Sequence, residues 1–306
     1  MFLLHPIKSS KAKLKSLRGR LDSIEGHLRL LQNMQEALGR VEARQLADRD
    51  SSQLSDNEFR VFSQSGEDGI IQFLLRHIKI ENRTFVEFGV EDYTEANTRF
   101  LLTNNKWAGL VLDSDADNIA NLKRSPNYWR YNFKAVQAFV TKDNINDILR
   151  DNGLVGEIGL LSIDIDGNDY WVWRAIEVIS PVIVVIEYNH RFGPDISVTV
   201  PYDELFDRRR QAAPLIYFGA SLKALCSLAA RKGYAFVGCN SNGVNAFFVR
   251  KDRKPDQIRE VLPGEGFVAG SFSELRDADG FPSKAGPEEE RRLIMGLPLV
   301  NVEDLD

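Results

Sequence analysis

Short apolar runs alternate with periodic segments between about residues 84 and 250. The runs are rich in Val, Ile and Phe and predict buried strands, whereas segments whose apolar residues recur every three or four positions predict helices. Because the two alternate, we expect an α/β fold with a mostly parallel sheet covered on both faces. The expected strands are 84–88, 108–112, 134–140, 160–163 and 181–186, and the expected helices begin near 95 or include 119–122, 144–149 and 170–179.

The last part of this region breaks the alternation. Ser221 is expected to cap a helix that stops at Gly233. Two apolar runs then flank Asn242-Gly243, a dipeptide favoured in tight hairpin turns. A parallel sheet that closes with an antiparallel hairpin narrows the choice of folds considerably. The two runs are 234–237 and 245–249.

Residues from about 11 to 48 follow a different pattern. Their apolar positions alternate steps of three and four, which is the heptad spacing of a coiled coil, and continue after a shift of phase. The narrow stripe favours pairing with a partner helix, so we expect a homo-oligomer formed through this segment. The alternative is an amphipathic helix lying on its own domain, with three glycines weakening any long rod. The stripe is Leu14, Leu17, Leu21, Ile24, Leu28 and Leu31, followed by Met34, Leu38 and Val41.

Polar segments divide the chain into three expected parts. Residues 1–57 comprise the N-terminal helix and a linker, and 58–250 form the α/β domain. Residues 251–306 are polar and rich in turns, and we assign no chemistry to this extension. At the start of the domain, Ser65 and Asp68 approximate a capping box for the next helix.

Composition narrows the class of function. The chain has 306 residues, and its formal net charge of -5 gives no reason to expect a nucleic-acid partner. Its only cysteines, Cys226 and Cys239, make neither a disulfide framework nor a zinc site, which favours a reducing compartment and a cytoplasmic location. Residues 1–4 are too short for a signal-peptide core, and no apolar run approaches the roughly 20 residues of a membrane span. The basic residues between 8 and 20 usually mark a solvated face, and they also allow peripheral contact with anionic lipids.

Polar residues stand where the first two strands end. Gly89 follows the first strand and would let the backbone approach a ligand without a Cβ in the way. Glu87 can accept hydrogen bonds from a cofactor or, alternatively, from neighbouring backbone N–H groups. Asp113 ends the second strand, where an acid can accept both hydroxyls of a ribose or, alternatively, cap the next helix. Gln64 and Asn97 lie beside these turns and are further candidates for binding a nucleotide-like cofactor at this edge of the sheet.

The segment Asp164-Ile165-Asp166-Gly167-Asn168-Asp169 is denser in acid than a turn requires. Glu187, Asn189 and His190 follow the adjacent strand, so we expect their side chains to converge with Asp164 at one edge of the sheet. Oxygen ligands from several carboxylates suit Mg²⁺, Ca²⁺ or Mn²⁺. The competing interpretation is that these residues initiate a turn and cap the next helix. The predicted metal ligands are Asp164, Glu187 and Asn189.

Together these elements resemble the class I S-adenosylmethionine-dependent methyltransferases, and most of all the FkbM-type sugar and polyketide methyltransferases. The resemblance implies a Rossmann-like sheet of seven strands whose last strand is reversed, with S-adenosylmethionine as cofactor. It implies that this cofactor is bound by residues at the ends of the strands and the turns beside them: Gln64, Glu87, Gly89, Asn97, Asp113 and Asp164. The motifs are Ser63-Gln64-Ser65-Gly66-Glu67-Asp68, Val86-Glu87-Phe88-Gly89, the acid ending the second strand, and Ser162-Ile163-Asp164-Ile165-Asp166-Gly167.

The chain departs from these families at two places. Glu91 and Asp92 stand in the first turn, where small residues are usual in the family. The chain is also similar to macrocin-type, metal-dependent sugar O-methyltransferases in its Asp-x-Asp. Tyr188, however, stands where those enzymes have a second acid after the fifth strand.

These patterns predict an O-methyltransferase acting on a sugar, a glycan or a similar polyhydroxylated small molecule. Its acceptor hydroxyl would lie near Asp164 and Glu187, assisted by Mg²⁺ or Mn²⁺, and Asp166 or His190 would act as general base. Arg208 to Arg210 would clamp an acidic acceptor or, more commonly, form a solvated face. Two alternatives stay open: a metal-dependent glycosyltransferase that uses Asp164-Ile165-Asp166, and a non-catalytic interaction protein with a methyltransferase fold.

Overall fold

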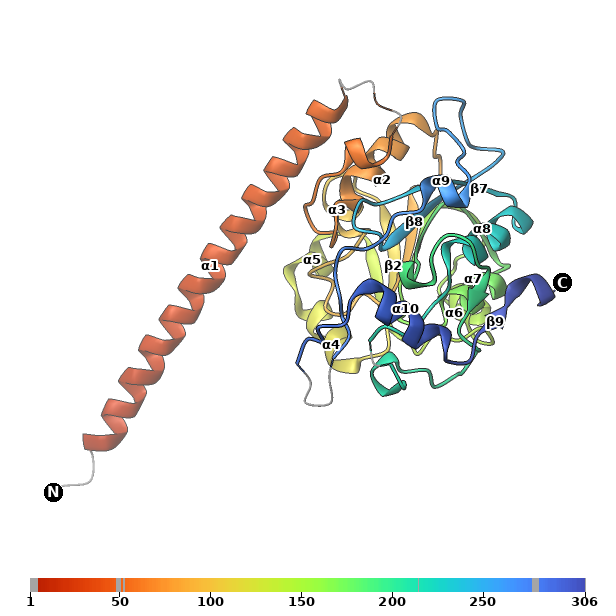
Figure 1. Ribbon diagram of the computed structural model, residues 1–306. Coiled ribbons are helices and arrows are strands. Elements are labelled where there is room, and N and C mark those ends of the chain that lie inside the picture. The colour runs from red at the N-terminus through yellow and green to blue at the C-terminus, as the bar shows by residue number, and fades with distance from the viewer. Residues whose placement is uncertain (1–4, 48–50, 52, 214, 277–280, 306) are drawn as a thin grey trace.

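A seven-stranded sheet forms the centre of the computed structural model, in the order β3-β2-β1-β4-β5-β8-β7. The structure describes residues 5–47, 51, 53–213, 215–276 and 281–305 (Figure 1). The strands are β1 Thr84–Phe88, β2 Ala108–Asp113, β3 Phe133–Gln137, β4 Gly156–Ile163, β5 Ile179–Glu187, β7 Tyr234–Cys239 and β8 Asn245–Arg250.

Strand direction confirms the expected fold class. β3, β2, β1, β4 and β5 pair in parallel, whereas β8 runs antiparallel to both β5 and β7. The last strand of the hairpin is therefore the reversed one, and it lies between β5 and β7. The hairpin turn contains Gly243 with φ +71, a left-handed conformation that glycine adopts without a steric penalty.

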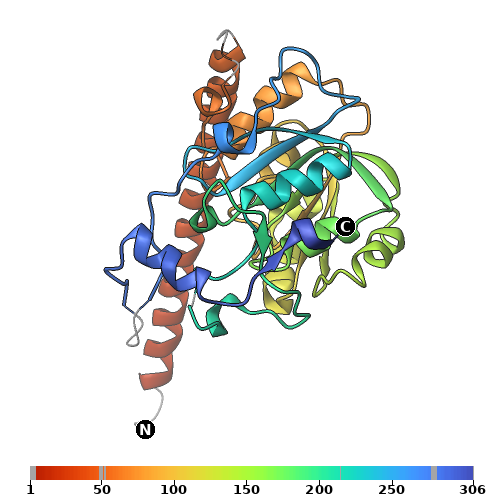
Figure 2. The same ribbon diagram turned by 45° about the vertical axis from the view of Figure 1, so that its right-hand side comes forward.

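Helices cover both faces of the sheet, as Figure 2 shows. One face packs on α2, α3 and α4, and the other packs on α6, α7 and α8. Both faces of the central strands are therefore buried, which explains their continuous apolar runs. The helices are α1 His5–Ala47, α2 Glu67–His77, α3 Arg99–Thr103, α4 Ala116–Arg124, α5 Pro126–Arg130, α6 Ile145–Asp151, α7 Asp169–Ala175, α8 Leu222–Arg231, α9 Pro263–Gly266 and α10 Pro287–Met295.

Several predicted boundaries are wrong. The helix expected over 170–179 ends at Ala175, because Ile179 already pairs with Gly156 of β4. The helix expected near residue 95 begins at Arg99, and the strand expected at 134–140 is Phe133–Gln137. In contrast, β1 has its predicted bounds, and Ser221 caps α8 by accepting a hydrogen bond from the Ala224 N–H.

The predicted Ser65 cap is also wrong. The residue before α2 is Gly66, with φ +96 and no side-chain cap. The Asp68 carboxylate instead accepts three backbone N–H groups, those of residues 61–63, at 2.7–2.8 Å. Asp68 thus stabilises the loop before the helix and not the first turn of the helix.

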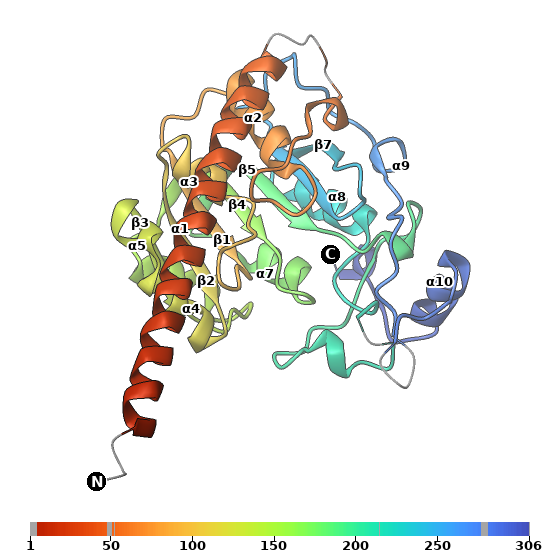
Figure 3. The ribbon, with the colours of Figure 1, turned by 90° about the vertical axis from the view of Figure 1, so that its left-hand side faces the viewer.

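α1 is one continuous helix of 43 residues. Its N-terminal half stands apart from the sheet domain in Figure 1, and its C-terminal turns pack on the segment before α2 and on α3 (Figure 3). Gly39 is needed at this contact, because a Cβ there would lie 2.3 Å from Cγ2 of Val61. Among the described residues no helix is long and apolar enough to cross a bilayer.

Two segments outside the sheet lie against each other. β6 Val198–Thr199, from the insertion between β5 and α8, pairs antiparallel with β9 Val300–Asn301 at the C-terminus. Their cluster buries Ile294 of α10 against Phe192 and Val200. The expected C-terminal extension therefore packs on the insertion that follows β5. In the part of the chain that the structure describes, short 3₁₀ helices lie at Ser55–Asn57, His190–Phe192, Arg208–Arg210 and Val302–Leu305.

Candidate functional site

The turn after β4 is held by the carboxylate of Asp169. This buried group accepts the backbone N–H of Ile165 at 2.8 Å and that of Gly167 at 2.9 Å. Between them Asp166 has φ +58, a conformation that side chains with a Cβ rarely adopt. Gly167 is covered by the ring of Phe206, which a Cβ would meet at 2.2 Å. The acid-rich sequence therefore builds a strained and well-fixed turn.

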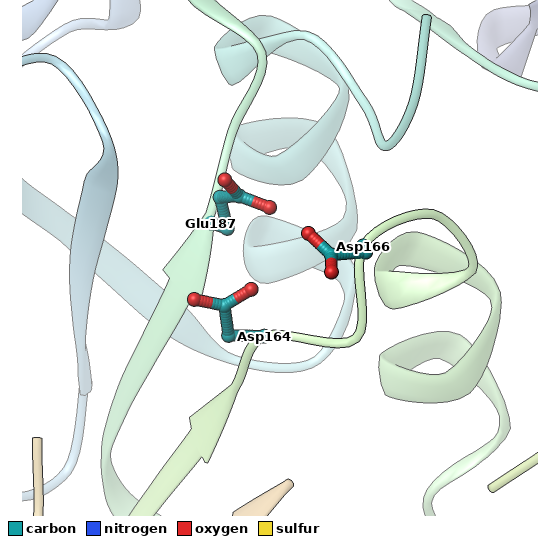
Figure 4. Close-up of side chains that lie close together, drawn as sticks. All are labelled: Asp164, Asp166 and Glu187. Atoms are coloured by element: carbon teal, nitrogen blue, oxygen red, sulfur yellow. The ribbon is translucent and has the colours of Figure 1, made fainter. Parts of the chain in front are cut away.

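Three carboxylates converge beside this turn. Asp164 follows β4, Asp166 lies in the turn and Glu187 ends β5, and Figure 4 shows their side chains pointing toward one another. One oxygen from each lies within 4.8 Å of those from the other two. The structure thus brings together Asp164 and Glu187, which were predicted as metal ligands, with Asp166, which was predicted as a base.

Asp164 and Glu187 are half-buried and Asp166 is exposed, so partial loss of hydration and mutual repulsion make this cluster electrostatically unfavourable without a cation. Loss of hydration, and then the neighbouring carboxylates, raise the pKa of Asp164 and Glu187 well above ordinary values. Oε2 of Glu187 is buried and has no hydrogen-bond partner among the described residues. Such an orphaned carboxyl oxygen, facing two other carboxyl groups, fits an oxygen-liganded divalent cation.

Arg208 places a positive charge beside the three carboxylates. Its Nη1 lies 2.8 Å from Oδ1 of Asp166, and its Nη2 lies 3.5 Å from Oε1 of Glu274. Arg191 lies between Glu274 and the buried Glu290 of α10. Its Nη2 is 3.8 Å from Oε2 of Glu274, and its Nε is 2.7 Å from Oε2 of Glu290. Charges therefore alternate from the carboxylates to the C-terminal extension.

The cluster predicts how stability depends on pH. Because the pKa values of Asp164 and Glu187 are raised in the folded state, folding binds protons, and this stability is lost as the pH rises above the ordinary Glu value of 4.5. In chelator we expect the urea midpoint to fall between pH 5.5 and 8, and Mg²⁺ or Mn²⁺ to reduce that fall by replacing the protons. A midpoint that rises over this interval, or a fall that the ions leave unchanged, would contradict the assignment.

Asn189 and His190 do not join the carboxylates, which corrects two predictions. The Asn189 side chain donates to the carbonyls of Ile216 and Phe218 and accepts the N–H of Arg191, so its amide holds the chain after β5. The His190 ring packs on Phe272 with 5.6 Å between ring centres. Burial, and then Arg191, lower the pKa of His190 to about 4, which makes the imidazole a weak base.

Glu87 accepts hydrogen bonds from neighbouring backbone N–H groups, which was the alternative to binding a cofactor. Its carboxylate accepts the backbone N–H of Asn97 at 2.8 Å and that of Thr98 at 3.0 Å, and so fixes the start of α3. Burial raises the pKa of Glu87 to about 7, although these bonds lower it. Asn97 donates its Nδ2 hydrogen to Oγ of Ser162 on β4 at 3.1 Å. Both residues therefore connect β1, β4 and α3 at the carboxyl edge.

Gly89 is required by the protein backbone itself. It has φ +74, and a Cβ there would lie 1.6 Å from the carbonyl oxygen of Asp164. We predicted that a ligand would lie close to the backbone of Gly89, whereas the group that lies there is the backbone carbonyl of Asp164, directly after β4. This contact holds Asp164 at the end of the sheet next to β1.

Asp113 lies at the end of β2 and reaches the turn after β1. Its two oxygens accept the N–H of Glu91 at 2.7 Å and that of Asp115 at 2.8 Å. The cap of α4 is Asp115, so the helix-cap alternative for Asp113 is wrong. A carboxylate has about four acceptor positions, which leaves capacity for two ligand hydroxyls. Gln64 is exposed just before α2.

The insertion after β5 contacts the site through several side chains. Asn168 donates to the carbonyl of Asp203 at 2.8 Å, and Trp171 donates to that of Val200 at 2.9 Å. Of the aromatic residues at the start of α7, Tyr170 and Trp173 are buried in the core, whereas Trp171 is half-buried.

Sequence reasoning missed the residues that the tertiary structure brings to this site. Glu274 belongs to the extension to which we assigned no chemistry, and Arg191 and Glu290 carried no motif. Arg208 was marked only as one of three arginines. An acid next to a buried strand end was the signal for Asp164 and Glu187, and no comparable local signal exists for Glu274.

A scan against models of protein families gives no match, and a search of curated proteins gives none either. Among solved structures, an S-adenosylmethionine-dependent methyltransferase from Clostridium acetobutylicum ATCC 824 is similar, with 10% identity and a TM-score of 0.38 over 60% of this chain and 89% of that one. The N-terminal domain of EvdMO1 with SAH bound shows 10% identity and a TM-score of 0.41 over 61% and 80%. An O-methyltransferase from Bacillus cereus in complex with SAH shows 12% identity and a TM-score of 0.31 over 54% and 72%. Likenesses of this size carry no conclusion about substrate or chemistry.

Proposed function

We propose that this chain is an S-adenosylmethionine-dependent methyltransferase that methylates a hydroxyl group of a sugar-like, polyhydroxylated small molecule or glycan. The observation that carries the proposal is the convergence of the Asp164, Asp166 and Glu187 carboxylates at the carboxyl edge of the sheet. Strand order reverses between β1 and β4, and in open α/β sheets ligands bind in the crevice at such a point. The cluster borders this crevice through the contact of Gly89 with Asp164.

The turns after β1 and β2 supply the cofactor side of the crevice. Asp113 would accept the ribose hydroxyls on its free acceptor positions. Glu91 has φ +47 in the first turn, and its N–H is already held by Asp113, so this turn is fixed before any ligand arrives. Gln64 and Asn97 would lie toward the amino-acid end of S-adenosylmethionine, and the buried Glu87 supports them by holding α3. The cofactor would supply the electrophilic methyl group.

The three carboxylates supply the acceptor side. Glu187, with its orphaned buried oxygen, and Asp164 would hold a divalent cation, Mg²⁺ or Mn²⁺, whose chemistry is to lower the pKa of an acceptor hydroxyl. A polyhydroxylated acceptor suits this surface, because carboxylates accept several hydroxyl hydrogen bonds at once.

Asp166 is the residue to which we assign the acceptor's proton. Its carboxylate faces the other two, and Arg208 holds one of its oxygens at 2.8 Å. His190 contacts Phe272 instead and has a pKa lowered to about 4, so we assign it no proton transfer. The remaining reduction of the barrier would come from alignment of the reacting atoms beneath the insertion that Asn168 and Trp171 fasten to the site.

Thermal stabilisation by ligands tests this proposal. At 100 times its Kd, a ligand that binds only the folded state adds about 2.7 kcal/mol of stability. We expect S-adenosylmethionine to raise the Tm, and Asp113→Ala to abolish most of that rise. A matched control is Asp117→Ala on the exposed first turn of α4, which should keep the rise.

Each alternative function has its own outcome in this experiment. Stabilisation by a nucleotide sugar with Mn²⁺, and none by S-adenosylmethionine, would replace the proposal with the glycosyltransferase that uses Asp164-Ile165-Asp166. No stabilisation by either ligand would favour a non-catalytic protein with this fold.

A further inference from the structure

The C-terminal third of α1 uses one face to contact its own domain. Gly39 and Leu46 are buried there, and Ala43 packs on the same cluster, which includes Val61 and Phe100. Gln35 adds a hydrogen bond from its side chain to the carbonyl of Val61. This face is small and close-packed, because a Cβ at Gly39 would also meet Phe100 at 3.1 Å.

The heptad stripe is a different face of the same helix. Leu38 is 61% exposed and Val41 is 39% exposed, although their neighbours Gly39 and Ala43 pack on the domain. Farther along, every stripe residue from Leu14 to Leu31 is 53–70% exposed. The alternative in which the stripe covers the chain's own domain is therefore wrong. A contiguous row of exposed leucines is unusual on a monomer and marks an interaction surface.

A second copy of this helix fits the stripe. The six residues from Leu14 to Leu31 alternate as a and d positions, and Gly19 and Gly26 both fall at f, on the far side of such a pair. In an antiparallel pair Leu14 meets Leu31 of the second copy, Leu17 meets Leu28, and Leu21 meets Ile24. This set closes on itself by two-fold symmetry, as a homodimer interface must.

Charge favours the antiparallel orientation. In an antiparallel pair the e position Arg18 meets the e position Glu25 of the second copy, twice by symmetry. In a parallel pair the g position Arg20 would also meet a Glu25, but Lys13 would meet Arg18, and the lysines and arginines between residues 13 and 20 of both copies would lie side by side. The stripe is also narrow and flanked by Asp22 and Glu25, unlike the wide apolar face and cationic border of a helix that lies on anionic lipid.

We propose that this chain forms a homodimer through an antiparallel two-stranded coiled coil of residues 14–31. The two sheet domains then lie toward opposite ends of the paired helices. This assignment is independent of the proposed methyl transfer, since none of its residues lies at the carboxylate cluster.

Light scattering coupled to size exclusion tests the pairing on the full chain. We expect a mass of twice 34.6 kDa at micromolar concentration. Leu21→Asn should give the monomer, whereas Leu30→Asn should leave the dimer intact, since Leu30 is equally exposed at 57% against 59% but lies off the stripe. A monomeric wild-type chain, or a dimer that survives Leu21→Asn, overturns the proposal. Retention by phosphatidylserine vesicles of a chain that is monomeric in solution would indicate a lipid surface instead.

Disulfide cross-linking tests the orientation. Leu14→Cys together with Leu31→Cys should give a covalent dimer on mild oxidation, whereas Leu14→Cys alone should give no more than the wild-type chain with Cys226 and Cys239. Efficient cross-linking by Leu14→Cys alone would require a parallel pair and overturn the antiparallel one. All of these substitutions lie on the exposed helix, so the melting of the sheet domain should not change and verifies that each variant is folded.

Discussion

Replacing Glu187 by glutamine is expected to lower methyl transfer roughly 100-fold or more, in line with the loss of a group that binds a catalytic cation or orients an acceptor. The same change removes one of three mutually repelling carboxylates, of which Asp164 and Glu187 are half-buried and Asp166 is exposed. We therefore expect the ligand-free variant to be more stable than the wild type at pH 8, with a higher urea midpoint. Loss of activity together with gain of stability distinguishes a functional role from a structural one.

The matched control is Glu177→Gln, the same substitution at an exposed position near the other end of β5. It should change neither turnover nor stability. The measurements are initial rates with S-adenosylmethionine and a panel of sugar acceptors, Mn²⁺ titration by calorimetry, and urea unfolding in chelator. The assignment of Glu187 fails if its variant keeps wild-type turnover and Mn²⁺ affinity, or if its stability falls while the control is unaffected.

Gly89→Ala is expected to destabilise the protein by about 4 kcal/mol or more, which is at the extreme of single substitutions. Its Cβ would lie 1.6 Å from the carbonyl oxygen of Asp164, so the end of β1 or the turn after β4 must move. Either movement displaces Asp164 from the other two carboxylates. We therefore expect any folded fraction to have lost divalent-cation affinity as well.

Gly153→Ala separates this crowding from the cost of the backbone conformation. Gly153 has φ +81, close to the φ +74 of Gly89, but a Cβ there would have nothing within 4 Å. It should therefore lose only about 1 kcal/mol, the ordinary cost of alanine in a left-handed conformation. Urea unfolding of both variants measures the difference, and equal losses would show that the contact with Asp164 is unimportant.

The local pattern of residues was sufficient to locate the seven strands of the sheet, although not all of their boundaries. Apolar runs bounded by turn residues located β1 and β2, and Asn242-Gly243 located the hairpin whose last strand is reversed. These signals are local, because strand burial and turn chemistry depend on neighbouring residues. Boundaries failed where distant groups compete for the backbone, as at Arg99, where the carboxylate of Glu87 accepts the N–H groups that precede α3.

Part of the site could also be predicted, because its acids stand directly after strands that the sequence locates. Parallel strands present their carboxyl ends at one edge, so acids after neighbouring strands had to lie near one another, and Asp164 and Glu187 do. What sequence alone could not decide is which neighbouring polar groups turn inward. Asn189 and His190 follow the same strand as Glu187, but the carbonyls of Ile216 and Phe218 and the ring of Phe272 hold them elsewhere.

The sequence by itself determined the seven strands of the central sheet in outline, most of the helices that cover it, the acids at the strand ends and the heptad stripe of α1, because each depends on residues a few positions apart. Only the tertiary structure decided that Arg208 and Glu274 form an ion pair beside the carboxylates. It also decided that the chain's own domain does not cover the stripe. Those outcomes depend on contacts between residues far apart in the chain, and packing, burial and charge compensation select such contacts only when the whole domain is assembled.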